Sequence, residues 1–356
     1  MKLLQASDFH LDSPFRQLEE EKAVTRRREL RELPARLAKL AVEEGVDLVL
    51  LPGDLFDGER VYPETVEALA EALASIPAPV FIAPGNHDHC RPGSPYLTAR
   101  WPENVHIFTR REMESVELSE LNCVIHGCAF IENHREDDPL AGFAAPDDGK
   151  LHLFCVHGEV GKEGRYGPID PRSLALSGGD YVALGHVHAG TGLQFEGNTP
   201  WAYPGCPEGR GFDELGAKGC LIVTVEKGRT EAEFRPVSGR RYRIERVEAN
   251  SFRESLPAEP SPDLVRIILT GESENTPDLD GLTALAQPHF FHVELRDETT
   301  LPESLWARQE EDSLTGLFLR EMSRQLESAD GEQRAQLLLA TRFGLAALEG
   351  REDIRP

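Results

Sequence analysis

The stretch that decides the fold runs from Val46 to Asp57 and reads VDLVLLPGDLFD. Its first half is a mostly apolar run, which is typical of a strand buried on both faces of a parallel sheet. Its second half, Gly53-Asp54-Leu55-Phe56-Asp57, begins where that strand ends. Open α/β sheets bind their ligands outside the carboxyl ends of the strands. We therefore expect Asp54 to lie at the centre of a functional site.

Four other segments repeat this form, in which an apolar run leads into a turn with His, Asp or Asn. They are Asp8-Phe9-His10, Gly85-Asn86-His87-Asp88, His157-Gly158 and Gly185-His186-Val187-His188. Taken singly, each histidine is more often a buried, hydrogen-bonded residue than a ligand. Carboxylate and amide oxygens suit hard divalent cations, and imidazole adds affinity for Mn, Fe or Zn. The set as a whole therefore predicts one site with two metal ions, which together can clamp a phosphate.

The order of elements predicts an α/β protein. Strand, helix, strand, helix and strand patterns follow one another up to about residue 83, which favours a parallel sheet with crossover helices. Later strand candidates, including those at 200–204, 219–225, 231–237 and 241–247, are expected to complete a second sheet. We predict a four-layer αββα sandwich over residues 1–245. A small α/β capping region over 246–300 and a helical tail over 301–356, broken near Asp330-Gly331, are expected to follow.

The composition limits the surface chemistry. Asp and Glu number 62 against 38 Lys and Arg, a formal net charge of −24, so most of the surface should repel nucleic acid and anionic membranes. Any polyanionic substrate must be attracted locally. Two basic clusters, Arg26-Arg27-Arg28 and Arg240-Arg241 with Arg243, lie near glutamates, so we interpret the first as a solvated helix face and the second as an edge strand. The sequence shows neither a signal peptide nor an apolar run of about 20 residues, so we expect a cytoplasmic protein with reduced thiols and no membrane association.

The ordered motifs D-x-H, G-D-x-x-D, G-N-H-D, H-G and G-H-x-H together resemble the calcineurin-like metallophosphoesterase superfamily. Residues 8–15 (DFHLDSPF) and 203–210 (YPGCPEGR) are similar to its DNA-repair exonuclease branch, which contains the bacterial SbcCD nuclease subunit and YhaO-type relatives. The resemblance covers about residues 1–240. It implies two divalent metal ions, with Mn²⁺ favoured and Fe, Zn or Mg as alternatives.

The resemblance also implies roles for individual residues. One metal would be held by Asp8, His10, Asp54 and His188, and the other by Asp54, Asn86, His157 and His186, with Asp54 as the bridge. His87 is similar to the family's phosphate-contacting or proton-donating histidine, and Asp88 would orient it by a hydrogen bond. Some relatives carry a histidine in place of Asp57, which leaves the role of Asp57 open. Arg210 is a candidate for phosphate binding.

The function most consistent with these features is a DNA exonuclease that acts in DNA repair. The resemblance implies a coiled-coil ATPase partner of the SbcC or YhaN type, bound through the C-terminal part. The alternative for that part is a tail that folds back on its own domain. A homodimer could form through residues 63–75 or 94–101. Two other functions remain open, namely a small-molecule or cyclic-nucleotide phosphodiesterase and a metal-binding scaffold without catalysis.

Overall fold

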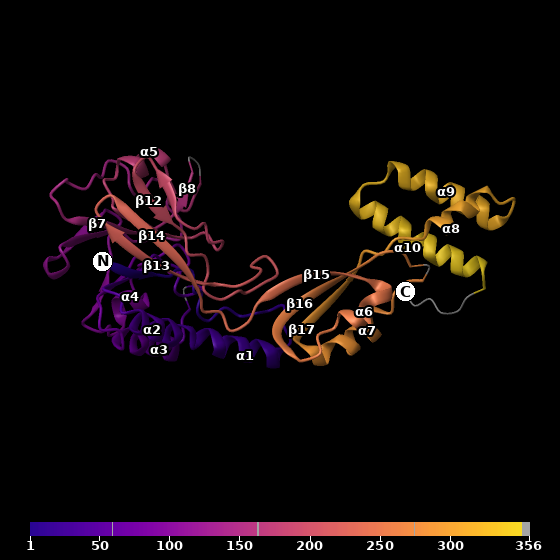
Figure 1. Ribbon diagram of the computed structural model, residues 1–356, viewed down its shortest axis with the longest axis horizontal. Helices are drawn as coiled ribbons and strands as arrows, with labels where there is room; N and C mark the ends of the chain where they lie inside the picture. Colours follow the sequence, from indigo (N-terminus) through magenta and orange to yellow (C-terminus); the bar gives the residue numbers. More distant parts are fainter. Residues whose placement is uncertain (59, 162–163, 274, 351–356) are drawn as a thin grey trace. The chain divides into compact units, whose positions relative to one another are not determined.

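The computed structural model describes residues 1–350 except 59, 162, 163 and 274, so the last residues of the predicted tail, 351–356, lie outside the described residues. The chain forms two compact units, one from Met1 to Arg241 and the other from Tyr242 onward. Figure 1 shows two stacked sheets in the first unit and a smaller sheet with helices in the second. The further predicted division near residue 300 stays a prediction.

The first sheet of the N-terminal unit has the order β14-β13-β1-β2-β3-β4. The strands are β1 (Lys2–Gln5), β2 (Leu48–Leu51), β3 (Val80–Ile82), β4 (Val105–Ile107), β13 (Gly219–Glu226) and β14 (Arg229–Pro236). β1 to β4 pair in parallel, and β13 and β14 add an antiparallel edge. The connecting helices are α1 (Glu20–Arg31), α2 (Leu33–Glu44) and α3 (Pro63–Ala74), so the predicted strand–helix alternation is confirmed.

The second sheet has the order β11-β12-β10-β7-β6-β5. Its strands are β5 (Glu114–Leu118), β6 (Cys123–Gly127), β7 (Leu151–His157), β10 (Tyr181–Gly185), β11 (Gln194–Glu196) and β12 (Thr199–Ala202). The short elements around it are α4 (Pro95–Thr98), a 3₁₀ turn at Ser119–Leu121, the pair β8 (Glu159–Val160) and β9 (Pro168–Ile169), and α5 (Pro171–Leu176). β7 and β10 run in parallel at the middle of this sheet, which brings their carboxyl ends together.

The layers follow the predicted αββα order. Apolar side chains of both sheets, such as Leu50, Phe81 and Leu153, form one buried core between them. α2 and α3 cover the outer face of the first sheet, and α5 lies on the outer side of the second (Figure 1). Leu174 of α5 is buried against Phe154 of β7 in a separate outer cluster. The predicted fold class is thereby confirmed.

Two assignments of strands to sheets are wrong. The residues of β13 and β14 were expected in the second sheet, but they pair beside β1 in the first. The strand predicted at 241–247 is β15 (Tyr242–Glu248), and it belongs to the second unit. Alternation of apolar and polar residues predicts a strand but not its neighbour, because pairing is decided by contacts distant in sequence.

Arg26 departs from its expected place on a solvated helix face. Its side chain is fully buried, and it donates hydrogen bonds to Glu208 at 3.0 Å and to the carbonyl of Gly209 at 2.9 Å. Arg240 likewise pairs with Glu29 of α1 through several short contacts. Both arginines therefore stabilise the fold through ion pairs.

The second unit is built on a three-stranded parallel sheet in the order β15-β16-β17. Its other elements are a 3₁₀ turn at Ala249–Ser251, α6 (Phe252–Ser255), β16 (Ser261–Thr270), α7 (Leu279–Ala286), a 3₁₀ turn at Gln287–His289, β17 (Phe290–Asp297), α8 (Glu303–Ala307), a 3₁₀ turn at Arg308–Glu310, α9 (Leu314–Ser328) and α10 (Gly331–Leu348). The helix break predicted near Asp330 is confirmed. No helix among the described residues has both the length and the apolar character required to cross a membrane.

A buried amide joins the two sheets of the first unit. The Gln5 side chain on β1 donates to the carbonyls of Leu184 at 2.9 Å and Ala202 at 3.0 Å in the opposite sheet. Its oxygen accepts a short hydrogen bond from the Tyr181 hydroxyl. Buried polar groups are costly unless they are paired, so this cluster fixes how the sheets stack.

Gln5→Leu should lower the free energy of unfolding by roughly 3 kcal/mol, because it leaves a buried hydroxyl and two carbonyls without partners. Adding Tyr181→Phe should recover part of that loss, because the orphaned hydroxyl is removed. Urea unfolding of the single and double variants measures both effects. Strictly additive effects would show that the two side chains do not interact.

Candidate metal centre

The predicted metal ligands lie at the carboxyl ends of five strands: His157 is the last residue of β7, and the others are on the loops that follow β1, β2, β3 and β10. Backbone hydrogen bonds join the first two loops: the amide of Asp8 donates to the carbonyl of Gly53, and that of His10 to the carbonyl of Asp54, each at 3.0 Å. These hydrogen bonds hold the two loops against each other without the help of a ligand. Rigid elements of this kind are what a two-ion site requires.

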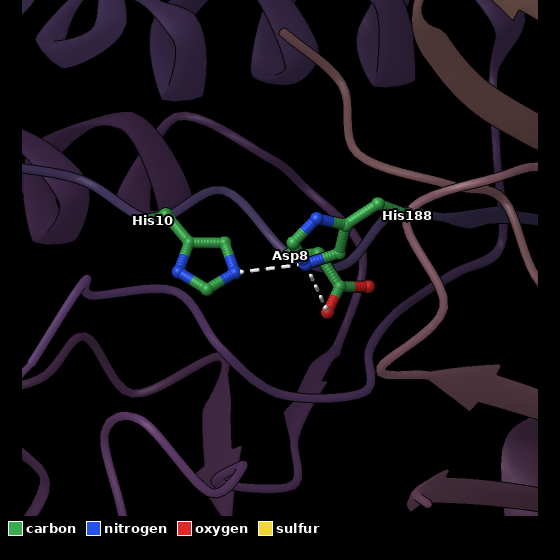
Figure 2. A group of neighbouring side chains, drawn as sticks. All are labelled: Asp8, His10 and His188. Atoms are coloured by element: carbon green, nitrogen blue, oxygen red, sulfur yellow. Dashed lines mark hydrogen bonds and ion pairs between the residues drawn. The ribbon is translucent and has the colours of Figure 1, made fainter. Parts of the chain in front are cut away.

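Asp8, His10 and His188 form the first group of possible ligands (Figure 2). Each offers one donor atom, and these atoms lie within 4.8 Å of one another. Nε2 of His10 is 3.1 Å from Nε2 of His188, and the latter is 3.9 Å from an oxygen of Asp8. Asp8 and His188 are far apart in sequence, and the stacking of the sheet that contains β1 on the sheet that contains β10 brings them together.

Asp54, His157 and His186 form the second group, also with donor atoms within 4.8 Å. The side-chain oxygen of Asn86 joins them, at 3.0 Å from Nε2 of His157 and 3.2 Å from Nδ1 of His186. Every residue that the sequence assigned to the second metal is thus brought to one place. Their roles as ligands stay predictions.

Asp54 lies between the two groups. The same carboxylate oxygen, Oδ2, is 3.8 Å from Nε2 of His10 and 3.5 Å from Nε2 of His157. Its other oxygen accepts a hydrogen bond from the backbone amide of His87 at 2.9 Å. A single oxygen that faces both groups is the position that a bridging carboxylate occupies.

The outer nitrogens of three rings are held by acceptors. Nδ1 of His10 lies 3.1 Å from Asp57, Nδ1 of His157 lies 3.0 Å from the Pro52 carbonyl, and Nδ1 of His188 lies 2.7 Å from Glu214. An acceptor at Nδ1 fixes the proton there and leaves the lone pair of Nε2 directed at the centre. Metal-binding histidines in proteins are held in this way.

The electrostatics also fit bound cations. Burial, the charge of Asp88 and the charge of Asp8 raise the pKa of Asp54 well above its usual value. Burial and the nearby Arg210 lower the pKa of His10, and burial with the neighbouring His157 lowers that of His186 to about 3. These rings are neutral at pH 7, so they do not balance the buried carboxylates. Divalent ions would balance them, and the donor set of carboxylate, amide and imidazole suits such ions.

The backbone is strained at this place. Asp8, His10, Asp54 and His186 have φ values of 58°, 47°, 53° and 114°, in a region that side-chain-bearing residues rarely adopt. Strain of this kind gathers at functional sites, where surrounding structure holds it. Gly85 is needed beside it, because a Cβ atom there would lie 2.2 Å from a carboxylate oxygen of Asp54.

His87 is exposed and Asp88 is buried, although the two residues are adjacent in the sequence. His87 is exposed beside the centre; its ring is 4.7 Å edge-on from that of His10, and its Nδ1 is 3.3 Å from the Asp57 carbonyl. We expected Asp88 to orient this ring, and that is wrong. Asp88 is buried and accepts from the amides of Gly85 and Leu55, at 2.8 and 2.7 Å, and from the Tyr96 hydroxyl. It therefore supports the loops rather than the imidazole.

Arg210 is held at the rim of the site by two carboxylates. It donates to Asp57 at 3.0 Å and to Glu214 at 3.1 Å. Glu214 was missed from the sequence, because no motif surrounds it. Burial alone would raise the pKa of Glu214, but its hydrogen bond to His188 and the charge of Arg210 hold that pKa at about 2. Asp57 and Glu214 are thus positioning residues for His10 and His188.

Glu214→Ala should weaken binding of a divalent ion about 10- to 100-fold, because His188 loses the acceptor that orients its ring. Glu214→Gln should have a smaller effect, since its amide oxygen can still accept from Nδ1. Titration calorimetry with Mn²⁺ measures both. Glu231→Ala, which changes an exposed glutamate on β14, is the control, and unchanged affinity in Glu214→Ala would contradict the role.

Comparison with known proteins agrees with this geometry. The model of the calcineurin-like phosphoesterase family matches residues 1–190. The uncharacterized metallophosphoesterase YhaO of Bacillus subtilis is 30% identical over 300 residues, which cover 76% of this chain and 72% of YhaO. Two relatives are named DNA double-strand break repair protein Mre11. The one from Methanopyrus kandleri is 25% identical, over 72% of this chain and 61% of its own. The one from Aeropyrum pernix is 26% identical, over 64% and 58%.

The chain therefore spans about three fifths of the length of the two Mre11 relatives. The family match covers more than half of the 356 residues and includes the loops of Asp8, Asp54, His87, His157 and His188. The resemblance found in the sequence is confirmed. The chain belongs to the calcineurin-like phosphoesterase family, whose members are metal-dependent hydrolases that bind two divalent ions.

Proposed function

We propose that this protein hydrolyses phosphodiester bonds of DNA as an exonuclease, with two divalent ions and Mn²⁺ as the preferred metal. The observation that carries the proposal is the position of Asp54 Oδ2 between two ligand groups, with His87 exposed beside them. When bound, the ions supply Lewis-acid polarisation of a phosphoryl group and activation of water.

The chain's own residues would hold and protonate the substrate. His87 is the exposed imidazole at the centre, and its Nδ1 faces the Asp57 carbonyl. With Nδ1–H donating to that carbonyl, Nε2 is the atom left to meet a phosphoryl or leaving oxygen. In the imidazolium form Nε2 can donate a proton, which is the general-acid role proposed here. Asp57 then serves twice, through its carbonyl for His87 and through its carboxylate for His10.

DNA as the substrate is supported by the relatives. Two of them are named as proteins of DNA double-strand break repair, although both are 26% identical or less. The acidic composition opposes broad electrostatic binding of DNA. The substrate would therefore bind mainly at the metal centre. The electrostatic attraction between the rest of the protein surface and the DNA backbone would be small.

Asp54→Asn should abolish Mn²⁺-dependent degradation of end-labelled DNA, because the shared oxygen loses its charge. His87→Ala should slow it roughly 100-fold or more, the usual effect of removing a general acid. His134→Ala changes an exposed histidine outside the ligand groups and should leave the rate unchanged. Full activity of either Asp54→Asn or His87→Ala would overturn the assignment.

Two other functions are separated by the choice of substrate. A small-molecule or cyclic-nucleotide phosphodiesterase would cleave members of a nucleotide panel faster than linear duplex or single-stranded DNA; the acidic surface favours this alternative. A binding scaffold would hold metal but leave bis-p-nitrophenyl phosphate intact. Parallel assays on these substrates with the wild-type protein distinguish the three possibilities.

We also propose that the C-terminal helices bind a coiled-coil ATPase of the SbcC or YhaN type. α9 buries Leu319, Met322 and Leu326, as a helix that packs on its own unit does. Its first turn, however, exposes Leu314 by 67% and Leu317 by 59%. Neighbouring exposed leucines on one helix are the kind of apolar patch that partner proteins cover. Pairing of two copies through α3 or α4 stays a prediction.

Leu314→Glu combined with Leu317→Glu should abolish co-purification with such an ATPase. Charges at the start of a helix are compatible with its dipole, so the helix itself should persist. Gln336→Glu adds a charge at an exposed position of α10 and should leave co-purification unchanged. Retention of the ATPase by the double variant would rule out this surface.

A further inference from the structure

A cavity of about 500 Å³ adjoins the metal centre. It lies between the antiparallel strands β13 and β14 and the loops that follow β10 and β12, and His188 is part of its wall. Its size falls within the range of pockets that bind small molecules, about 300–1,000 Å³. No residue proposed for the reaction other than His188 lines it.

The loops that form the cavity are held in place by the backbone. The amide of Cys206 donates to the carbonyl of His188, and that of Thr191 to the carbonyl of Tyr203, each at 3.1 Å. Gly205 has φ of 77°, and a Cβ atom there would lie 2.8 Å from the His188 carbonyl oxygen. The close approach of these loops requires glycine, so the cavity wall is a fixed part of the fold.

The side chains of the cavity wall include exposed apolar groups and one cation. Phe234 on β14 and Leu215 on the loop before β13 are exposed by 42% and 44%, and both face this cavity. Exposed apolar side chains that gather at one hollow mark a binding site. Lys218 supplies a cation; its Nζ is 3.4 Å from the His188 carbonyl, and no carboxylate pairs with it among the described residues.

We propose that this cavity binds the terminal nucleotide of the DNA strand, with its base against Phe234 and its phosphate near Lys218. The inference rests on the proposed function, because it gives the substrate a place beside the metal centre. An aromatic face, an apolar side and one unpaired cation match a base and a phosphate in a single ligand. Stacking accepts any base, so the cavity should confer little sequence preference.

Equilibrium titration of the full-length, Mn²⁺-loaded protein with dAMP tests the proposal. Phe234→Ala should bind dAMP about tenfold more weakly, a usual effect of losing a base-stacking ring. Lys218→Met keeps the aliphatic stem and should weaken binding of dAMP but not of deoxyadenosine. The KM for a short oligonucleotide should rise with the same variants, and by more than kcat falls.

Phe195→Ala, on the exposed edge strand β11, is the matched control and should bind dAMP as the wild type does. Phe234→Leu keeps apolar packing but not the aromatic face, so it replaces Phe234→Ala if that variant unfolds. Unchanged dAMP affinity in both Phe234 variants would overturn the proposal. Equal affinity of the wild type for dAMP and 2-deoxyribose 5-phosphate would also overturn it, because the base would then contribute nothing.

The same experiment separates this inference from the proposed function. If dAMP binding depends on Phe234 but DNA is not degraded, the cavity is a nucleotide site and the exonuclease function fails. If DNA is degraded with a KM that neither Phe234 nor Lys218 affects, the function stands and the cavity proposal fails.

Discussion

The constraint on which the structure depends is buried negative charge where the two sheets meet. Asp8, Asp54 and Asp88 are all buried, and the mutual effect of these carboxylates is part of why the pKa of Asp54 is raised. Desolvated carboxylates are tolerated only when cations or hydrogen bonds compensate them. Asp88 is compensated by amides and a hydroxyl, whereas Asp54 accepts from one backbone amide and otherwise faces the imidazoles of His10 and His157. Two divalent ions are the compensation that the family supplies.

The close approach of the sheets is what concentrates this charge. A Cβ atom on Gly185 would lie 1.7 Å from the Pro52 carbonyl oxygen, so the ends of β2 and β10 are in direct backbone contact. Asp54 and His186 lie close after this contact in their two chain segments, and their φ values of 53° and 114° are ones that side-chain-bearing residues rarely adopt. Hydrogen bonds between the loops offset that strain. The glycines, the strained residues and the candidate ligands therefore lie together where the two sheets approach each other.

Local pattern was enough to predict which side chains gather at this edge of the fold. Each candidate ligand follows an apolar run, and parallel strands bring their carboxyl ends to one edge whatever lies between them. The supporting residues were not predictable in this way. Glu214 reaches His188 from a loop with no motif, and Arg26 is buried only because the loop of Glu208 covers α1. The pairing of β13 with β1 was also not predicted. Alternation of apolar and polar residues indicates a strand, but it does not specify which strand lies beside it.

Charge decides how such an acidic protein could hold a polyanion. The arginines near the centre are already neutralised: Arg210 pairs with Asp57 and Glu214, and Arg26 pairs with Glu208. Because both guanidinium groups already pair with carboxylates, they would contribute little attraction to an incoming phosphate. Under the proposals above, the remaining attraction would come from the metal ions and from Lys218, whose Nζ lies 3.4 Å from the His188 carbonyl. A substrate held by so few charges would bind with a shallow dependence on salt, unlike proteins that contact many phosphates.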